Sequence, residues 1–245
     1  MIKLIKRYKT EIILFLLFVL LHLPDLGHDN FNTDVWKWKA RTYDFGSGVF
    51  NLNFSQTIQK YHPGVTLMWL GTIGIKTYNL FYDLVYKSSP PDNNVKTVFE
   101  LDFVMKILIV ITIGASLVIS FNLLKRMFGG QYALIYFVLL SLEPFYLGLT
   151  RVIHLEGLMT TFMLVSFLYI YLYVFEDQRK RNLILSALFG SLAVLTKTAA
   201  IFLVPFSYLA ILIGLFLTSG AFLPKIKKSI FTYLKWLLPF ILFFI

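Results

Sequence analysis

Asp34 is the first side chain of the sequence whose surroundings suggest catalysis. It follows the first long apolar run, in a stretch from His28 to Phe45 that also carries two tryptophans and three Lys or Arg residues. Charges so close to an apolar segment are costly unless they have a function or a hydrated position. A carboxylate there can act as a general base toward a hydroxyl or bind a divalent metal. It can equally be a simple helix cap.

A second polar group lies between positions 151 and 156, at the start of a later apolar run. Arg151 suits a phosphate, because its planar guanidinium can bind two oxygens at once. Glu156 can also be explained by the favourable dipole of a helix N-terminus. His154 can be a polar residue of the membrane interface with no further role. The three together nevertheless favour a site.

Three further ionisable residues stand alone among apolar or turn residues. Lys197 separates two apolar runs, where it can neutralise a lipid-linked phosphate or extend to the headgroups. His62 precedes Pro63 and Gly64, which predicts a turn. Glu143 interrupts an apolar run, and such acids are either functional or close enough to the surface to reach water.

The composition indicates the kind of protein that must position these residues. Of 245 residues, 58% are hydrophobic and only 15% are charged, against about 25% charged in soluble domains. Several apolar runs of roughly 20 residues predict an all-α, polytopic transmembrane bundle. The absence of cysteine excludes disulfides and thiolate metal sites. The net charge of +10 comes mostly from loops between apolar runs, and no nucleic-acid-binding motif accompanies it.

The apolar runs predict about seven spans in one membrane domain, residues 1–245. We expect them near residues 11–26, 103–124, 132–149, 155–175, 183–195, 199–217 and from 230 onward. Residues 27–98 contain no clear span and are predicted to form a long extracytoplasmic loop with interfacial helices. Within this loop we expect a turn at Gly46–Asn53 and an aromatic-rich interfacial helix at Val65–Tyr86.

The distribution of cations orients this predicted topology. With a cytoplasmic N-terminus, twelve Lys and Arg residues fall on the cytoplasmic side, and only Arg151 and Lys197 fall in the short outer loops. A span at Val65–Tyr86 would reverse that bias. The topology therefore predicts that Asp34, Arg151, Glu156 and Lys197 share the outer water boundary, although they are far apart in sequence.

These motifs, in this order, resemble the membrane-embedded GT-C glycosyltransferases. The resemblance is specifically to the group of dolichyl-phosphate-mannose protein mannosyltransferases and bacterial lipid A aminoarabinose transferases. The resemblance rests on Asp34, His62-Pro63-Gly64, Glu143-Pro144-Phe145, Arg151 with Glu156, and Leu195-Thr196-Lys197.

The resemblance implies an enzyme that moves a sugar from a polyprenyl-phosphate-linked donor to a protein, lipid or glycan acceptor on the extracytoplasmic face. Asp34 would be the catalytic base, and Arg151 and Lys197 would hold the donor phosphate. The remaining candidates would position the donor or a divalent metal; they are Glu156, His154 and His62. Membrane lipids are expected partners, and nucleic acid is not.

The sequence also departs from the family pattern. Many relatives carry a second acid beside the first-loop aspartate, whereas Val35 follows Asp34 here, which weakens the prediction of a metal. Relatives often have His-Pro-Pro where this chain has Gly64 in the third position. Relatives are also longer, so we expect the chain to be an N-terminal part of such an enzyme.

Two other function classes stay open at this stage. A transporter or flippase of a lipid-linked solute would carry ionisable residues deep in several spans and would show inverted repeats. The charges here gather at one predicted face and no repeat is evident, which favours the enzyme. A non-catalytic assembly subunit is the third class.

Overall fold

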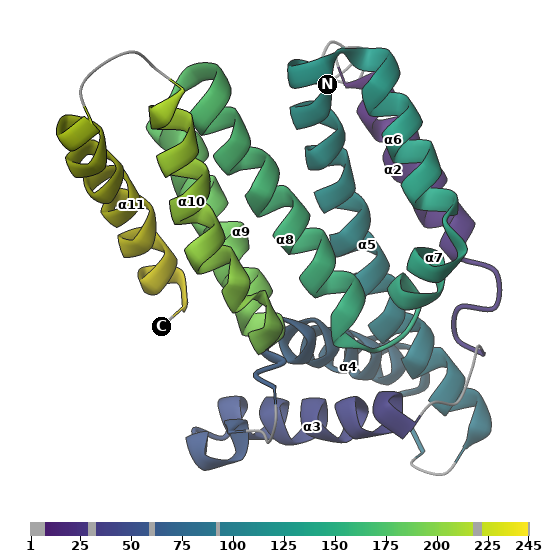
Figure 1. The fold of residues 1–245 in the computed structure, drawn as a ribbon. Helices are drawn as coiled ribbons and strands as arrows, with labels where there is room; N and C mark the ends of the chain where they lie inside the picture. Colours follow the sequence, from purple (N-terminus) through teal and green to yellow (C-terminus); the bar gives the residue numbers. More distant parts are fainter. Residues whose placement is uncertain (1–7, 29–32, 59–61, 92–93, 218–221, 245) are drawn as a thin grey trace. The chain divides into compact units, whose positions relative to one another are not determined.

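The described part of the chain is helical throughout. The computed structural model describes residues 8–28, 33–58, 62–91, 94–217 and 222–244, and these ranges contain helices and turns but no strand (Figure 1). The predicted all-α fold is therefore confirmed. The chain forms two compact units, which are Met1–Val118 with Leu140–Leu158, and Ile119–Leu139 with Met159–Ile245.

Three helical segments of the described chain are long and apolar enough to cross a membrane. The first is α5, Val95–Phe128. The second, Leu155–Asp177, joins α8, Leu155–Leu172, to the π-helical turn η2, Tyr173–Asp177. The third, Thr198–Phe216, joins the 3₁₀ turn η3, Thr198–Phe202, to α10, Leu203–Phe216. The chain is thus an integral membrane protein.

A further apolar helix pair is bent at the predicted Glu143-Pro144 interruption. Helices α6, Gly130–Leu142, and α7, Pro144–Thr150, pass the same test only as a pair, bent by 69°. Glu143 is the N-cap of α7, and its carboxylate accepts hydrogen bonds from the backbone N–H groups of Phe145 (3.1 Å) and Tyr146 (2.6 Å). This capping role gives Glu143 a structural explanation.

The remaining predicted spans do not meet that test. Helices α2, Lys9–His22, and α9, Lys180–Thr196, are 14 and 17 residues long. Helix α11, Phe222–Phe244, carries four lysines. Within the described residues there are therefore three candidate spans by length and composition, or four if the bent pair is one span.

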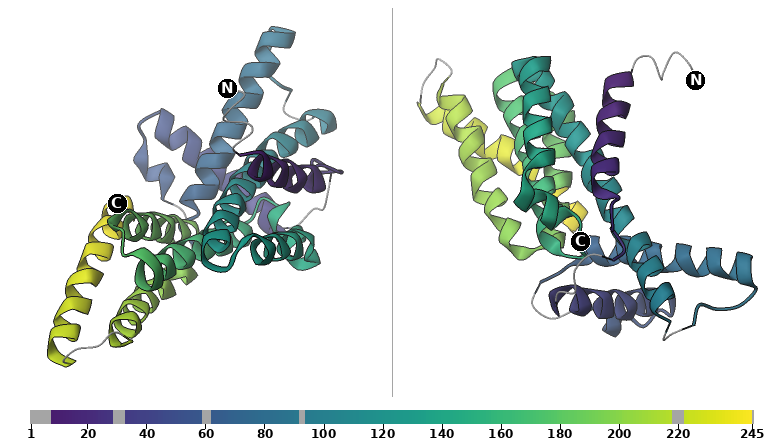
Figure 2. Two further views of the ribbon diagram at one scale, coloured as in Figure 1. Left: turned by 90° about the horizontal axis from the view of Figure 1, so that it is seen from above. Right: turned by 90° about the vertical axis from the view of Figure 1, so that its right-hand side faces the viewer.

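The second unit is held by polar contacts buried among apolar helices. Helix α11, yellow in Figure 2, packs against α9 and α10. Trp236 of α11 is fully buried and donates its indole N–H to the Ser186 hydroxyl at 3.0 Å. Ser191 of α9 donates to the backbone carbonyl of Phe240 at 2.6 Å. These bonds fix the register of α11 on α9.

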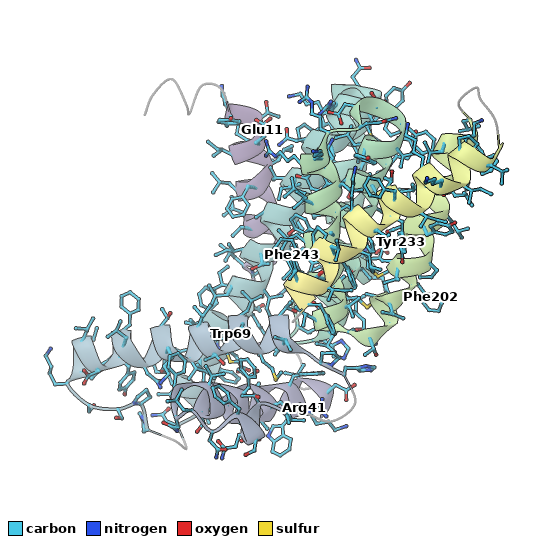
Figure 3. The ribbon with its side chains drawn as sticks, turned by 90° about the vertical axis from the view of Figure 1, so that its left-hand side faces the viewer. Glu11, Arg41, Trp69, Phe202, Tyr233 and Phe243 are labelled. Carbon is cyan, nitrogen blue, oxygen red and sulfur yellow. The ribbon has the colours of Figure 1, made fainter. Side chains whose placement is uncertain are left out.

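In the first unit, α3, Thr33–Phe50, lies beside α4, Val65–Tyr86 (Figures 1 and 3). Gly71 of α4 allows the close approach, because a Cβ there would come within 2.6 Å of the Thr42 side chain. Trp69 meets the ring of Phe45 edge-on at 5.3 Å between centroids. Helix α4 has the bounds predicted from the sequence, and it is not among the candidate spans.

The predicted turn at Gly46–Asn53 is wrong in its first half. Helix α3 continues to Phe50, and the chain turns only at residues 51–53, where Leu52 has φ +56°. The short 3₁₀ turn η1, Phe54–Thr57, follows. Gly46 serves packing instead of ending the helix, because a Cβ there would lie 3.0 Å from Thr72 of α4.

Gly64, the third residue of His62-Pro63-Gly64, could not be replaced by a proline. Its φ of +60° lies in the left-handed region, which proline cannot adopt because its ring holds φ near −65°. The ring of Trp38 also lies so close that a Cβ at Gly64 would come within 2.1 Å of it. His-Pro-Gly therefore belongs to a turn built against Trp38, at the N-cap of α4.

Candidate active site

Two contacts join the end of α2 and the residues after it to the end of α7 and the residue after it. His22 is fully buried; its Nδ1 lies 2.7 Å from the Phe18 carbonyl, and its Nε2 lies 2.7 Å from the Thr150 hydroxyl at the end of α7. Next along the chain, Arg151 donates a guanidinium N–H to the Pro24 carbonyl. The segment between α7 and α8 is therefore fixed against the segment that leads from α2 toward α3.

Asp34 and His154 meet in this region although 120 positions separate them. Asp34 Oδ2 lies 3.9 Å from His154 Nε2, and His154 Nδ1 lies 3.6 Å from Glu156 Oε2. The imidazole thus stands between two carboxylates, at ion-pair distances that exceed those of hydrogen bonds. Asp34 also pairs with Lys37 of the next helical turn at 3.3 Å. We call Asp34, His154 and Glu156 the acid–imidazole row.

The row combines an accessible carboxylate with two more sheltered groups. The Asp34 side chain is 52% exposed, whereas those of His154 and Glu156 are 21% and 27% exposed. Asp34 lies in the first turn of α3, and Glu156 lies in the first turn of α8, where the helix dipole favours an acid. Asp34 is therefore accessible from water, whereas His154 and Glu156 are more sheltered.

Two predicted site residues lie outside the contacts just described. His62 is partly buried in the turn before α4. Lys197 is the C-cap of α9, in an extended conformation (φ −151°, ψ 133°), and it belongs to the second compact unit. The roles of both residues, and the meeting of Lys197 with Arg151, stay predictions.

The described residues do not supply an evident metal centre. Among them, no group of three or more His, Asp and Glu side chains is arranged to hold a metal ion. The acid–imidazole row runs from one group to the next and does not surround a common point. A divalent-metal requirement therefore stays a prediction for the assay.

The sequence analysis did not identify two charged positions on α5. Asp102 forms an ion pair with Lys39 of α3, and both side chains are largely buried, at 16% and 19% exposed. Lys106, one turn later, is only 2% exposed. The available signal was the presence of ionisable residues in a helix otherwise apolar enough to span, because such residues are costly there and are retained for a reason.

The fold defines a class, that of polytopic helical membrane proteins. The family model described as dolichyl-phosphate-mannose-protein mannosyltransferase matches residues 97–245, more than half of the chain. The chain belongs to this family, whose members are glycosyltransferases of the GT-C type. The matched range includes Arg151, His154, Glu156 and Lys197, while Asp34 and His62 precede it. The searches of curated proteins and of solved structures found no match.

Proposed function

We propose that the protein transfers a sugar from a polyprenyl-phosphate-linked donor to an acceptor on the extracytoplasmic face of the membrane. The observation that carries this proposal is the contact of Asp34 with His154, and of His154 with Glu156, in a chain of this family. The family match favours a mannosyltransferase-type enzyme over a transporter or flippase of a lipid-linked solute.

In the proposed reaction, Asp34 acts as general base. Its carboxylate takes the proton of the acceptor hydroxyl while the hydroxyl oxygen forms a bond to the anomeric carbon of the donor sugar. The bond from that carbon to the phosphate oxygen breaks, and its electron pair leaves with the polyprenyl phosphate. His154, between Asp34 and Glu156, orients the base; Glu156 and His62 position the donor.

Cations are needed where the polyprenyl phosphate develops its charge. Fixed positive groups beside a leaving anion stabilise the transition state more than the ground state. Arg151 suits this task, since its planar guanidinium can bind two phosphate oxygens at once. We assign the leaving phosphate to Arg151 together with Lys197.

The proposal includes the finer topology. Seven spans and a cytoplasmic N-terminus would put residues 27–98 outside, with α3 and α4 at the interface. The excess of cytoplasmic cations supports this orientation. The exposed apolar and aromatic side chains near the end of α4 support its interfacial position; they include Leu80, Phe81, Leu84, Val85 and Tyr86.

A transfer assay on the full chain in proteoliposomes tests the proposal. Polyprenyl-phosphate mannose is supplied with a serine- and threonine-containing peptide, a lipid or a glycan as acceptor, with and without EDTA. We expect transfer by the wild type and by Asp44→Asn, an exposed carboxylate of the same helix, and loss of transfer in Asp34→Asn. Full turnover of Asp34→Asn would remove Asp34 as the base. No transfer from any polyprenyl-phosphate sugar would remove the donor class.

A further inference from the structure

A groove on α3 takes no part in the acid–imidazole row. It has a volume of about 430 Å³ and lies between α3 and the first turns of α5, within the range of roughly 300–1,000 Å³ that small-molecule sites occupy. We call it the Trp36 groove and define it by His28, Trp36, Lys39, Tyr43, Phe99 and Asp102. All six residues belong to the first compact unit.

Two large aromatic side chains form one wall of this groove. Trp36 and Tyr43 lie seven residues apart on α3, which puts them on the same helix face. They are 64% and 46% exposed, although tertiary packing buries Trp38 of the same helix to 4%. Asp34 lies two residues before Trp36, which is about 200° around the helix. The groove is therefore distinct from the face that carries Asp34.

The polar groups of the groove come as a neutral pair. The Lys39 ammonium donates to the Asp102 carboxylate. An ammonium has three donors and a carboxylate about four acceptor positions, so this bond leaves donors and acceptors for a ligand. The two charges cancel, which disfavours a phosphate or another strongly charged group. A ligand with hydroxyl groups can use both the donors and the acceptors.

A pyranose matches this combination of surfaces. One face of the ring presents C–H groups, which pack on the electron-rich face of an aromatic side chain. Its rim presents hydroxyls, which both donate and accept. Mostly apolar walls with a few placed polar groups are the general pattern of small-molecule sites.

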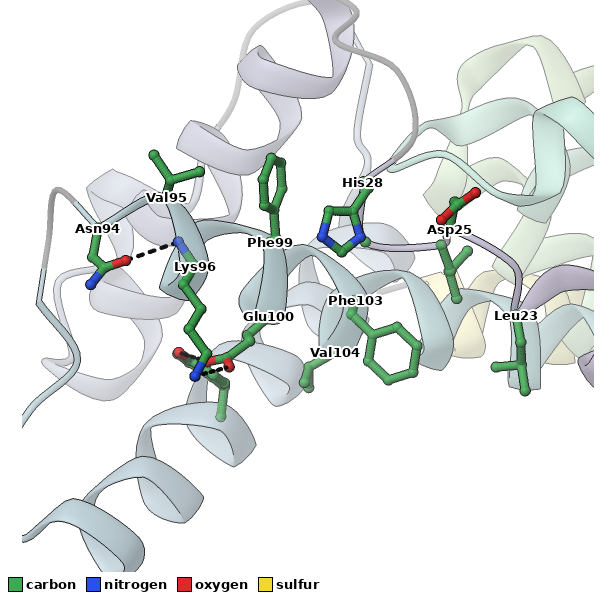
Figure 4. Close-up of a pocket in the computed structure, with 13 residues that line it drawn as sticks. Leu23, Asp25, His28, Asn94, Val95, Lys96, Phe99, Glu100, Phe103 and Val104 are labelled. Atoms are coloured by element: carbon green, nitrogen blue, oxygen red, sulfur yellow. Dashed lines mark hydrogen bonds and ion pairs between the residues drawn. The ribbon is translucent and has the colours of Figure 1, made fainter.

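The groove also borders a second cavity. Gly27, His28 and Phe99 line both this groove and a neighbouring cavity of about 1,060 Å³ (Figure 4). The rings of His28 and Phe99 lie 4.5 Å apart between centroids. In the neighbouring cavity, Glu100 accepts a hydrogen bond from Tyr78 at 2.9 Å and pairs with Lys96 at 3.8 Å. Polar groups thus line both cavities, which suits a ligand that carries hydroxyl groups along its length.

We infer that the Trp36 groove binds a neutral saccharide. If the proposed function holds, on which this second step rests, the saccharide is the non-reacting part of a glycan acceptor. The aromatic wall would then contribute to acceptor affinity and not to the chemical step.

Binding can be measured without any transfer reaction. The full chain in nanodiscs is titrated with mannotriose and with chitotriose, and bound saccharide is detected by saturation-transfer NMR. We expect saturable binding of at least one probe, weakened about tenfold in Trp36→Ala, as the loss of an aromatic contact implies. The matched control is Phe54→Ala, which removes an aromatic side chain of similar exposure, 62%, outside the groove. Phe54→Ala should bind like the wild type.

Three results would overturn the inference. They are no saturable binding of either probe to the wild type, equal binding by Trp36→Ala, and quenching of Trp36 fluorescence by brominated lipids that saccharide does not relieve. The last result would make Trp36 a bilayer anchor. If the saccharide is part of the acceptor, Trp36→Ala should raise the acceptor KM in the transfer assay and leave kcat unchanged. Saccharide binding together with full turnover of Asp34→Asn would refute the catalytic proposal and leave the groove intact.

Discussion

Each end of the segment Leu155–Asp177 lies beside an aspartate, and the two aspartates are held differently. Asp177, at its last residue, is 13% exposed and accepts hydrogen bonds from Arg126 at 2.5 Å and from Asn182 at 2.6 Å. Asp34, beside the first turn, is 52% exposed, and its contacts with Lys37 and His154 measure 3.3 and 3.9 Å. A carboxylate enclosed by short bonds stabilises a fold, whereas an accessible one can meet a substrate.

The largest expected effect is a difference in turnover between the Asp34→Asn and Asp177→Asn variants. Asp34→Asn removes the proposed base, and general-base catalysis typically contributes about 10²–10⁴-fold. Asp177→Asn should leave turnover per folded molecule nearly unchanged. The measurement is the transfer assay, normalised to protein that remains monodisperse in detergent. Equal losses in both variants would show that the exposure of Asp34 has no catalytic meaning.

The next largest effect is expected from the arginines near the two ends of Leu155–Asp177, Arg151 and Arg126. Arg151→Lys keeps the charge but loses the planar fork that suits a phosphate. A hydrogen bond to a charged group is worth about 1.5–3 kcal/mol, so kcat/KM for the donor should fall roughly 10- to 100-fold. Arg126→Lys, at the Asp177 end, is the matched control and should transfer normally. A normal kcat/KM in Arg151→Lys would contradict its assignment to the phosphate.

The two substitutions should affect the free energy of unfolding in the opposite order, with the larger loss in Asp177→Asn. Asp177→Asn weakens its bonds to Arg126 and to the backbone N–H of Arg179, and we expect the free energy of unfolding to fall by about 1–3 kcal/mol. Asp34→Asn should change it little, because exposed ion pairs contribute about 0–1 kcal/mol. Unfolding of both variants in mixed detergent micelles, followed by circular dichroism, measures the difference. A more stable Asp177→Asn would refute the structural role of that cluster.

The fold was predictable where one strong signal decided it. Long apolar runs predicted an all-α membrane protein, and aromatic patterning predicted the bounds of α4. The prediction that a turn begins at Gly46 was wrong. The sequence does not distinguish a glycine that lets a neighbouring helix pack closely from one that ends a helix. The number of spans depends on short or lysine-bearing helices such as α9 and α11, for which length and composition alone decide little.

The sequence could indicate candidate residues for a site, but it could not indicate which side chains are in contact. The sequence analysis named Asp34, His154 and Glu156 as candidates, and their side chains form a row of contacts, while their roles stay predictions. The pairing of Lys39 with Asp102 depends on how α3 lies against α5, which no local pattern encodes. The capping role of Glu143 was also hidden, because it depends on the bend between α6 and α7.

The smallest expected effect concerns a third carboxylate, Glu100, which accepts a hydrogen bond from the neutral phenol of Tyr78 in addition to its ion pair with Lys96. Burial raises the pKa of Tyr78 above its ordinary value, and the hydrogen bond to Glu100 raises it further. The folded state therefore keeps the phenol proton more tightly than the unfolded chain does. The resulting stability is complete below the unfolded pKa of about 10 and is lost as pH rises above it.

Tyr78→Phe should lower the free energy of unfolding at neutral pH by about 1 kcal/mol, because the bond to Glu100 is lost. Between about pH 9 and 11 its stability should fall less steeply than that of the wild type, since the group that titrates is gone. Tyr86→Phe, an exposed tyrosine two turns along α4, should keep the wild-type slope. Parallel slopes for Tyr78→Phe and the wild type would mean that Tyr78 titrates alike in both states, and that Glu100 does not hold its proton.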